Sequence, residues 1–286
     1  MTAYIKSILD LYIYSSLHVA IVVTLFCAET FIFTCHEIDI LYLGIVFCST
    51  LFLYSLHRII GISKIKEEYI EGRYKIILKY KSHLVVYAII ALIGIISCLA
   101  LSSLGYLLFM VPLGIVSLLY SIPFLSNNRR LRDIHYIKIF LIGIVWSAVS
   151  IAPIAFSDQT IEWSILGLVA IEKFIYIIAI TIPFDIRDID IDQSLVTKTL
   201  PHYLGITKSY LTSYGLIVVS LLIYCIAAIV SNQTQTIPYI IIASVVSLIA
   251  ILISRGKKSD YYYSGILDGV IGIRALIIII GILVVL

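Results

Sequence analysis

The stretch "VAIEKFIYIIAITIPFDIRDIDID", from Val169 to Asp192, joins a very apolar run to four aspartates within eight residues. The whole chain has only 17 acidic residues among 286. With 61% hydrophobic residues, 13% charged residues and a mean hydropathy of +1.09, it has too much apolar surface for a soluble globule. The sequence therefore predicts an integral membrane protein that gathers negative charge at the end of one membrane span.

Several apolar stretches are long enough to cross the hydrocarbon core, which takes about 20 helical residues. They cover roughly residues 11–34, 40–57, 83–102, 104–122, 137–156, 162–183, 208–230, 237–254 and 264–286. The alternation typical of outer-membrane strands is absent. We therefore predict an all-α integral membrane protein, a bundle of nine transmembrane helices that forms one domain over residues 1–286.

Lys and Arg are distributed unevenly over the connections between these spans. The connections after the second, fourth, sixth and eighth spans carry basic clusters, whereas "CHEID", "SSLG", "SDQTIEW" and "SNQTQT" carry no Lys or Arg. By the positive-inside rule the basic connections face the cytoplasm, so the N-terminus is inside and the C-terminus outside, in the inner (cytoplasmic) membrane.

The longer basic connections are expected to form a cytoplasmic polar cap of loops and short helices. Residues 61–83 have oppositely charged side chains at i,i+4 spacing, which predicts an amphipathic helix at the membrane surface. This helix either connects two spans or also covers an active site.

The aspartates share one face if residues 183–193 continue the sixth helix. At about 100° per residue, Asp185, Asp188 and Asp192 lie within roughly 60° of one another, and Asp190 points away. Three carboxylates on one stripe repel each other unless a cation lies between them, and such oxygen ligands suit Mg²⁺ with a substrate phosphate. The alternative is a solvated acidic helix end, which the positive side of a membrane and a helix C-terminus both disfavour.

The segment "DIRDIDIDQSLVTKTLPHYLG", residues 185–205, resembles the second aspartate-rich motif of the UbiA superfamily of intramembrane prenyltransferases. That pattern is D-x-x-D-x-x-x-D with a T-L-P-x-x-L-G-like tail; the glycine usual four residues after the last acid is Val196 here. "YYYSGILDG" resembles the start of the family's ninth helix. Residues that match the family's loop after the fourth helix are Tyr120, Ser121, Pro123, Arg132, Lys138 and Trp146.

The resemblance implies a cavity open to lipid, with a cytoplasmic polar site that holds a prenyl diphosphate through Mg²⁺. The diphosphate leaves, and a lipophilic acceptor attacks the allylic carbocation. The implied catalytic residues and metal ligands are Asp185, Asp188 and Asp192. The implied diphosphate-binding residues are His57, Arg58, Tyr120, Arg132, Lys138 and Lys198. The expected partners are the prenyl diphosphate, the acceptor and the lipid bilayer, with no nucleic acid.

The chain departs from the family at the first acidic motif, N-D-x-x-D, at the end of the second helix. No aspartate occurs between Asp39 and Asp133, and Ser55 and His57 stand where Asn and Asp are expected. Either His57 and Arg58 contact the diphosphate directly in place of a metal bridge, or this chemistry has been lost. A third reading gives His57 a structural hydrogen bond at the helix end.

Charged residues also occur deep inside predicted spans. Glu172, Lys173 and Arg274 lie about ten residues from a span end, hence about 15 Å deep. A charge at that depth costs roughly 2.5–3.5 kcal/mol on insertion scales, so it is expected to be paired. We predict that Glu172 pairs with Arg274, and that Glu29, nearer the outer end of its span, reaches the interface.

Three functions are therefore open at this stage. The first is an enzyme that transfers a prenyl group from an isoprenyl diphosphate to a membrane-partitioned acceptor, with Mg²⁺ held by the second aspartate motif. The second is a non-catalytic lipid- or quinone-binding protein that keeps the UbiA-like fold, which the missing first motif favours. The third is a transporter that uses the buried charges, although no span is interrupted by paired Gly and Pro.

Overall fold

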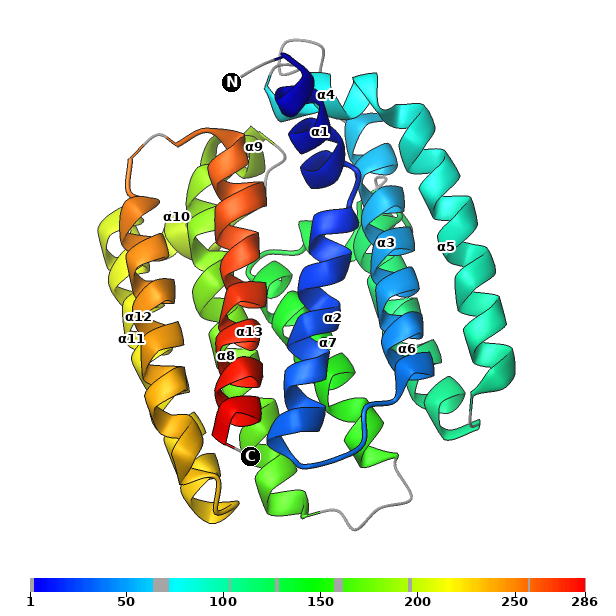
Figure 1. Ribbon diagram of the computed structural model, residues 1–286. Coiled ribbons are helices and arrows are strands. Elements are labelled where there is room, and N and C mark those ends of the chain that lie inside the picture. The colour runs from blue at the N-terminus through cyan, green and yellow to red at the C-terminus, as the bar shows by residue number, and fades with distance from the viewer. Residues whose placement is uncertain are drawn as a thin grey trace.

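Apolar α-helices form the bundle in Figure 1, a computed structural model that describes residues 3–63, 72–102, 104–126, 129–156, 162–194, 197–256 and 258–285. The longer helices are α1 (Ala3–Tyr14), α2 (Leu17–Phe33), α3 (Ile40–Ser63), α5 (Lys81–Leu101), α6 (Leu104–Ser121), α7 (Ile137–Ala155), α8 (Trp163–Arg187), α11 (Ile206–Val230), α12 (Ile237–Ile253) and α13 (Asp268–Val285). The short ones are α4 (Arg73–Lys79), α9 (Ile189–Ser194), α10 (Leu200–Leu204), the 3₁₀ turns η3 (Leu131–Asp133) and η4 (Thr234–Thr236), and the π-helical turn η5 (Tyr262–Leu267). No β-strand occurs in these ranges. Helices suit hydrocarbon because they satisfy their backbone N–H and C=O groups internally.

Eight helical segments in the described part of the chain are long and apolar enough to cross a membrane, and the bent pair α1 and α2 makes a ninth when counted as one span. This agrees with the predicted number. The two ends of the chain lie at opposite ends of the bundle, as an odd number of crossings requires (Figure 1). One end of the bundle carries the N-terminus, the last turns of α3 and α8 and the first turns of α7 and α13. We call it the basic end.

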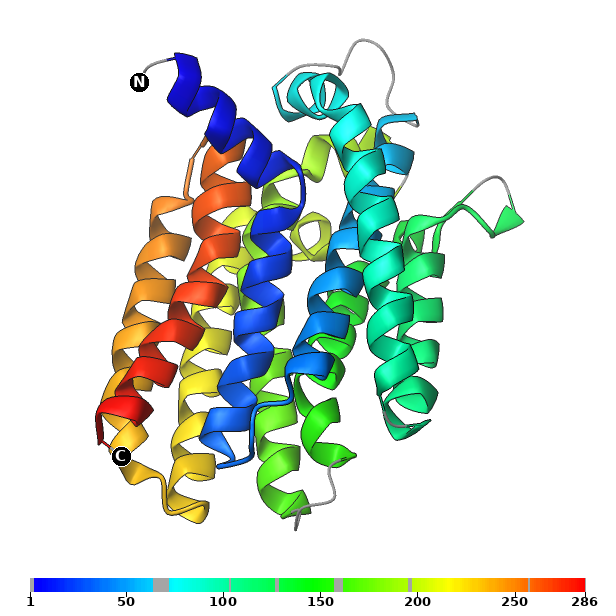
Figure 2. The same cartoon turned by 45° about the vertical axis from the view of Figure 1, so that its right-hand side comes forward.

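The first predicted span, residues 11–34, is not one helix. The axes of α1 and α2 differ by 57°. The break occurs at Ser16, whose φ of 73° is left-handed and cannot continue a right-handed helix. As a result α1 leans over the basic end, where Ile13 and Tyr14 pack against Ile77 of α4 (Figure 2).

The second span is longer than predicted, because α3 continues to Ser63 rather than ending at residue 57. His57 and Arg58 therefore project from the body of a helix and not from its end. Of the predicted surface helix over 61–83, residues 64–71 lie outside the described part of the chain. The remainder contains α4 and the start of α5, and α4 lies at the basic end (Figure 1).

Four charged side chains from three helices form a network inside the bundle. Arg274 Nη2 of α13 lies 2.9 Å from Glu172 Oε2 of α8, and Arg274 Nη1 lies 3.0 Å from Glu29 Oε2 of α2. Lys173 Nζ lies 3.4 Å from the same Glu29 oxygen and donates to the carbonyl of Phe26 at 2.8 Å. Each of the four charged residues is 1% exposed, and their charges cancel.

The predicted contact between Glu172 and Arg274 is therefore present. The expectation that Glu29 reaches the outer interface is wrong, because its carboxylate is the shared acceptor for Arg274 and Lys173. Cancellation of charge explains how four ionised groups are tolerated where water does not solvate them.

Replacing Glu172 by alanine should lower the free energy of unfolding by about 3–5 kcal/mol, because it removes one counter-charge from a buried ion pair. Thermal unfolding in detergent, followed by tryptophan fluorescence, measures the loss. The control is Ser220→Ala, which removes only a hydroxyl that donates to Glu172 and should cost about 2 kcal/mol. The double change Glu172→Leu with Arg274→Met should recover much of the loss. A Glu172→Ala variant as stable as the parent would contradict the structural role of the pair.

Candidate functional site

A cavity of about 650 Å³ extends from the basic end into the bundle, between helices α2, α3, α5, α6, α7, α8 and α13. Its lining at the basic end is charged and includes His57, Arg58, Arg130, Arg132, Lys138, Arg187, Asp188, Asp192 and Asp268. Its deeper walls are mostly aliphatic and aromatic side chains. The volume is in the range of small-molecule sites. A charged mouth above an apolar interior suits a ligand with a polar head and a long apolar tail.

The aspartates at the end of α8 converge on one amine. Lys138 Nζ, in the first turn of α7, lies 2.7 Å from Asp185 Oδ1 and 3.2 Å from Asp192 Oδ2. The assumption of one continuous helix is wrong, since α8 ends before Asp188 and α9 begins after it. The N–H of Asp192 still donates to the carbonyl of Asp188 at 2.9 Å, which preserves the helical spacing. Asp190 is exposed, as expected. The cation that the clustered carboxylates require is thus supplied by the chain itself.

Asp188 has a partner of its own. Arg187 Nε donates to Asp188 Oδ1 at 2.8 Å and Arg187 Nη2 donates to Asp188 Oδ2 at 2.9 Å, a bidentate pair. The guanidinium carbon also lies 5.2 Å from the ring centre of Phe184 and 4.9 Å from that of Tyr263. Arg187 is not among the site residues that the sequence predicted. The structure makes it the group that orients Asp188 toward the cavity.

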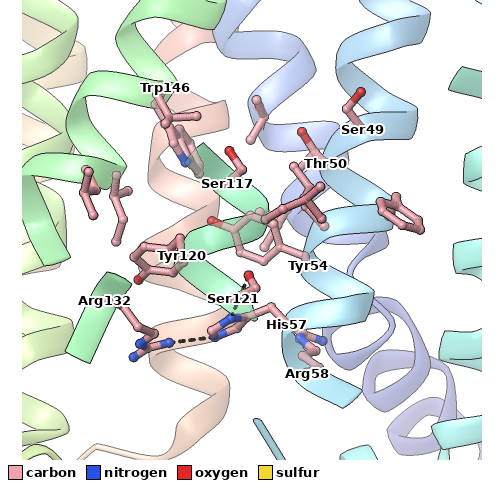
Figure 3. Close-up of a pocket in the computed structure, with 18 of the residues that line it drawn as sticks. Ser49, Thr50, Tyr54, His57, Arg58, Ser117, Tyr120, Ser121, Arg132 and Trp146 are labelled. Atoms are coloured by element: carbon pink, nitrogen blue, oxygen red, sulfur yellow. Dashed lines mark hydrogen bonds between the residues drawn. The ribbon is translucent and has the colours of Figure 1, made fainter. Parts of the chain in front are cut away.

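On the opposite wall, His57 of α3 is held between two protein groups (Figure 3). Arg132 Nη1 donates to His57 Nε2 at 2.7 Å, and His57 Nδ1 lies 3.3 Å from Ser121 Oγ. Because a guanidinium only donates, Nε2 must accept, so the ring is neutral and carries its proton on Nδ1. His57 lines the cavity as predicted, but both of its ring nitrogen atoms are engaged. Its geometry therefore favours positioning Arg132 over contacting a ligand itself.

Arg58 connects the cavity to α1. Its Nη1 donates to the carbonyl of Ile13 at 3.0 Å, and its guanidinium carbon lies 5.9 Å from the ring centre of Tyr14. The side chain also lines the cavity. Arg58 thus helps to hold α1 against α3 while adding positive charge to the mouth.

The loop before α7 supplies two more arginines. Arg130 Nη2 lies 2.9 Å from Asp133 Oδ1. Burial alone would raise the pKa of Asp133, but the hydrogen bonds from Arg130 outweigh burial and hold this pKa below its usual value. Burial opposes the charge of Arg132, yet Tyr120 and the carboxylates led by Asp192 hold the pKa of Arg132 above its usual value. Arg130 and Arg132 both line the mouth of the cavity.

Two residues depart from the sequence-based expectation. Lys198 is exposed and does not line the cavity; its N–H donates to His135 Nδ1 at 3.0 Å, in a segment that runs beside the start of α7. The structure therefore does not bring Lys198 to the other predicted site residues. Asp268, at the start of α13, lines the cavity and was not singled out. The sequence feature that could have indicated Asp268 is an acidic residue directly after "YYYSGIL", at the start of an otherwise apolar span.

The same arrangement of helices occurs in solved membrane proteins. A UbiA homologue from Archaeoglobus fulgidus bound to GPP and Mg²⁺ matches with a TM-score of 0.62 at 12% identity, over 95% of this chain and 99% of that one. A UbiA homologue from Aeropyrum pernix K1 without ligand matches with a TM-score of 0.64 at 12% identity, over 93% and 97%. The chain has the UbiA-type fold.

A digeranylgeranylglyceryl phosphate synthase shares this UbiA-type fold, with a TM-score of 0.58 at 16% identity over 98% of this chain and 99% of that one. No family model matches the sequence, and no curated protein matches it significantly. The resemblance of short motifs thus predicted a UbiA-type fold that whole-sequence comparison does not detect.

The carboxylates in this UbiA-type bundle do not form a complete metal centre by themselves. They fit a single divalent cation that a substrate phosphate also binds. No group of three or more His, Cys, Asp or Glu in the described ranges is arranged to hold a metal. Asp188 and Asp192 both line the cavity, however, and Mg²⁺ is usually held by one or two carboxylates plus substrate phosphates. The α3 wall has no carboxylate between Ile40 and Ser63, so it offers no ligand for a second ion.

Replacing Lys138 by methionine should destabilise the protein by about 3–5 kcal/mol, because Asp185 and Asp192 would then face each other without a cation. Added MgCl₂ should stabilise this variant more than the parent, since a divalent ion suits paired carboxylates. Thermal unfolding with and without MgCl₂ measures both effects. Lys198→Met, which removes an exposed lysine outside the cavity, should behave like the parent. A Lys138→Met variant that gains no more from MgCl₂ than the parent would argue against metal binding by these acids.

Proposed function

We propose that the protein transfers a prenyl group from an isoprenyl diphosphate to a lipophilic acceptor in the membrane. One observation carries the proposal: basic and acidic side chains cluster at the mouth of an apolar cavity, in a bundle of UbiA type. A related bundle binds GPP with Mg²⁺, which is a ligand of the same polar-headed, apolar-tailed kind.

The diphosphate would lie among Arg58, Arg130, Arg132 and Lys138. Its negative charge increases as the bond to the prenyl carbon breaks, so fixed cations stabilise the transition state more than the bound substrate. Arg132 is the central contact in this proposal because His57 holds it in place and Tyr120 lies beneath it, 5.3 Å from its guanidinium carbon. The positions of these cations are set before the substrate arrives.

Asp188 and Asp192 would hold the magnesium ion that accompanies the diphosphate. When bound, Mg²⁺ neutralises diphosphate oxygens and favours their departure as a leaving group. Arg187 orients Asp188, and Lys138 orients Asp192. Asp185 is 1% exposed behind Lys138, so its proposed role is to anchor that lysine and not to contact the ion.

The isoprenoid tail would occupy the apolar part of the cavity. Tyr54, Tyr120 and Trp146 line the region between this part and the charged mouth (Figure 3). Aromatic faces stabilise a nearby cation, and apolar walls keep water from the allylic carbocation. The division of the cavity therefore matches the two needs of the reaction, a charged leaving group and a protected cation.

The non-catalytic alternative also has a specific observation in its favour. Lys138 already binds Asp185 and Asp192, Arg187 already binds Asp188, and α3 supplies no acid. A protein that binds a lipid or quinone in the apolar cavity needs neither Mg²⁺ nor a diphosphate. Metal-dependent diphosphate binding separates the two functions.

Binding of geranyl diphosphate to the purified protein in detergent, titrated with MgCl₂, tests the proposed site. Asp188→Ala should abolish the Mg²⁺-dependent part of the affinity, because it removes a cavity-lining ligand. Asp190→Ala is the matched control, since Asp190 is exposed and two residues away. Folding should be retained in both. Equal Mg²⁺-dependent binding by Asp188→Ala and the parent would refute the role of Asp188, and absence of Mg²⁺-dependent binding in the parent would favour the non-catalytic alternative.

We also propose that the basic end faces the cytoplasm of a cell whose inner membrane holds the protein, as the distribution of Lys and Arg predicts. The C-terminus then lies outside. Alkaline phosphatase, which folds only outside the cytoplasm, should be active when fused after Leu286. An inactive enzyme there, with a fluorescent cytoplasmic reporter active at the same site, would reverse the orientation.

A further inference from the structure

The start of α13 presents one carboxylate to the cavity. Ser264, Asp268 and Ile271 line it at spacings of four and three residues, so they share one helix face. Asp268 is only partly buried in a bundle where most inward-facing residues are fully buried. The surface that it exposes therefore belongs to the cavity.

Asp268 differs from the other acids of the site in its partners. Lys138 binds Asp185 and Asp192, and Arg187 binds Asp188. Within the described ranges no hydrogen bond or ion pair reaches the carboxylate of Asp268. Arg58 and Arg187 lie within electrostatic range of this carboxylate but donate no hydrogen bond to it. Among the three carboxylates that line the cavity in the described ranges, Asp268 is the one that no ammonium or guanidinium group binds.

The height of Asp268 in the cavity is set by its neighbours on α3. It interacts electrostatically with Arg58 and with Tyr54, which lies one helical turn deeper than Arg58. Arg58 belongs to the charged mouth, and Tyr54 belongs to the aromatic region beneath it (Figure 3). In a prenyl diphosphate, the carbon that reacts is the one that joins the charged head to the apolar tail. A prenyl diphosphate bound with its head in the mouth and its tail in the apolar part would bring that carbon to the level of Asp268.

We propose that Asp268 is the general base that takes the proton of the acceptor; this rests on the proposed function. The acceptor is an alcohol or phenol whose hydroxyl group faces Asp268. Its oxygen forms a bond to the first prenyl carbon while the bond from that carbon to the diphosphate oxygen breaks. The diphosphate leaves with the electron pair, and the hydroxyl proton passes to a carboxylate oxygen of Asp268. The acceptor thus binds on the α3 and α13 side, opposite the acids of α8 and α9.

The chemistry favours Asp268 over the other acids of the site. A carboxylate bound to an ammonium or guanidinium group, or to Mg²⁺, has little capacity to accept a proton. Asp185, Asp188 and Asp192 are held in this way. A base at the rim of the apolar region also returns its proton to water through the charged mouth after each turnover.

The test uses the full-length protein in phosphatidylcholine vesicles with MgCl₂, deuterated geranyl diphosphate and a total lipid extract of the source cells as acceptor. Mass spectrometry measures the rate at which deuterated prenyl products appear. Asp268→Asn should lower this rate about 100-fold or more, which is the usual contribution of a general base, because an amide cannot take the proton. Geranyl diphosphate binding should change less than about threefold. Asp268→Glu should restore part of the rate.

Asp190→Asn is the control, since Asp190 is exposed and outside the cavity. Product formation by Asp268→Asn within about threefold of the parent would overturn the assignment and leave the proposed function intact. If Asp268→Asn and Asp268→Glu both lose geranyl diphosphate binding as well as product formation, the assignment of Asp268 as the base is overturned and its role is structural. A parent that binds geranyl diphosphate but forms no product overturns the proposed function, and the base with it.

Discussion

A charge in hydrocarbon needs a counter-charge, and this constraint fixes the bundle through Arg274. Its guanidinium group binds carboxylates from α2 and α8 at once, so α13 has one position in which the ion pairs with Glu29 and Glu172 are both made. Helix packing in lipid lacks the hydrophobic effect that drives it in water, which gives such polar contacts more weight in orienting helices. The face of α13 that lines the cavity, and with it Asp268, is placed by this network.

The same need for counter-charges applies to the cluster of aspartates at the mouth of the cavity. Lys138 lies between Asp185 and Asp192, and Arg187 is paired with Asp188, so each of these three acids has a cation beside it. On the opposite wall, Arg132 and Arg58 have no carboxylate from α3 to neutralise them. The basic residues that α3 and the loop before α7 bring to the mouth are His57, Arg58, Arg130 and Arg132, a set that suits an anion. In the proposed function the acids on the α8 side hold one divalent ion. The asymmetry between the walls follows from the absence of Asp and Glu in α3.

The sequence predicted more of the fold than of the site. Apolar runs and the distribution of Lys and Arg were sufficient for the number of spans, because length and charge act through the bilayer rather than through particular contacts. The sequence did not predict the break at Ser16, because serine is not a residue type that indicates a left-handed backbone conformation. The estimated depth of each residue in its span correctly predicted the contact between Glu172 and Arg274. The same kind of estimate wrongly predicted that Glu29 reaches the interface. Depth counted from a span end says nothing about which neighbouring helix supplies a partner.

By itself, the sequence determined the membrane class, the nine apolar segments, the shared face of Asp185 and Asp192 and the absence of acids on the second span. These are local properties, set by residue type and helical period. Only the tertiary structure decided that Lys138 lies between those acids, that His57 is used to hold Arg132, that Lys198 points away, and that Asp268 enters the cavity from α13. Each of these depends on the packing of helices far apart in the chain, and the energy of that packing is not encoded in any one segment.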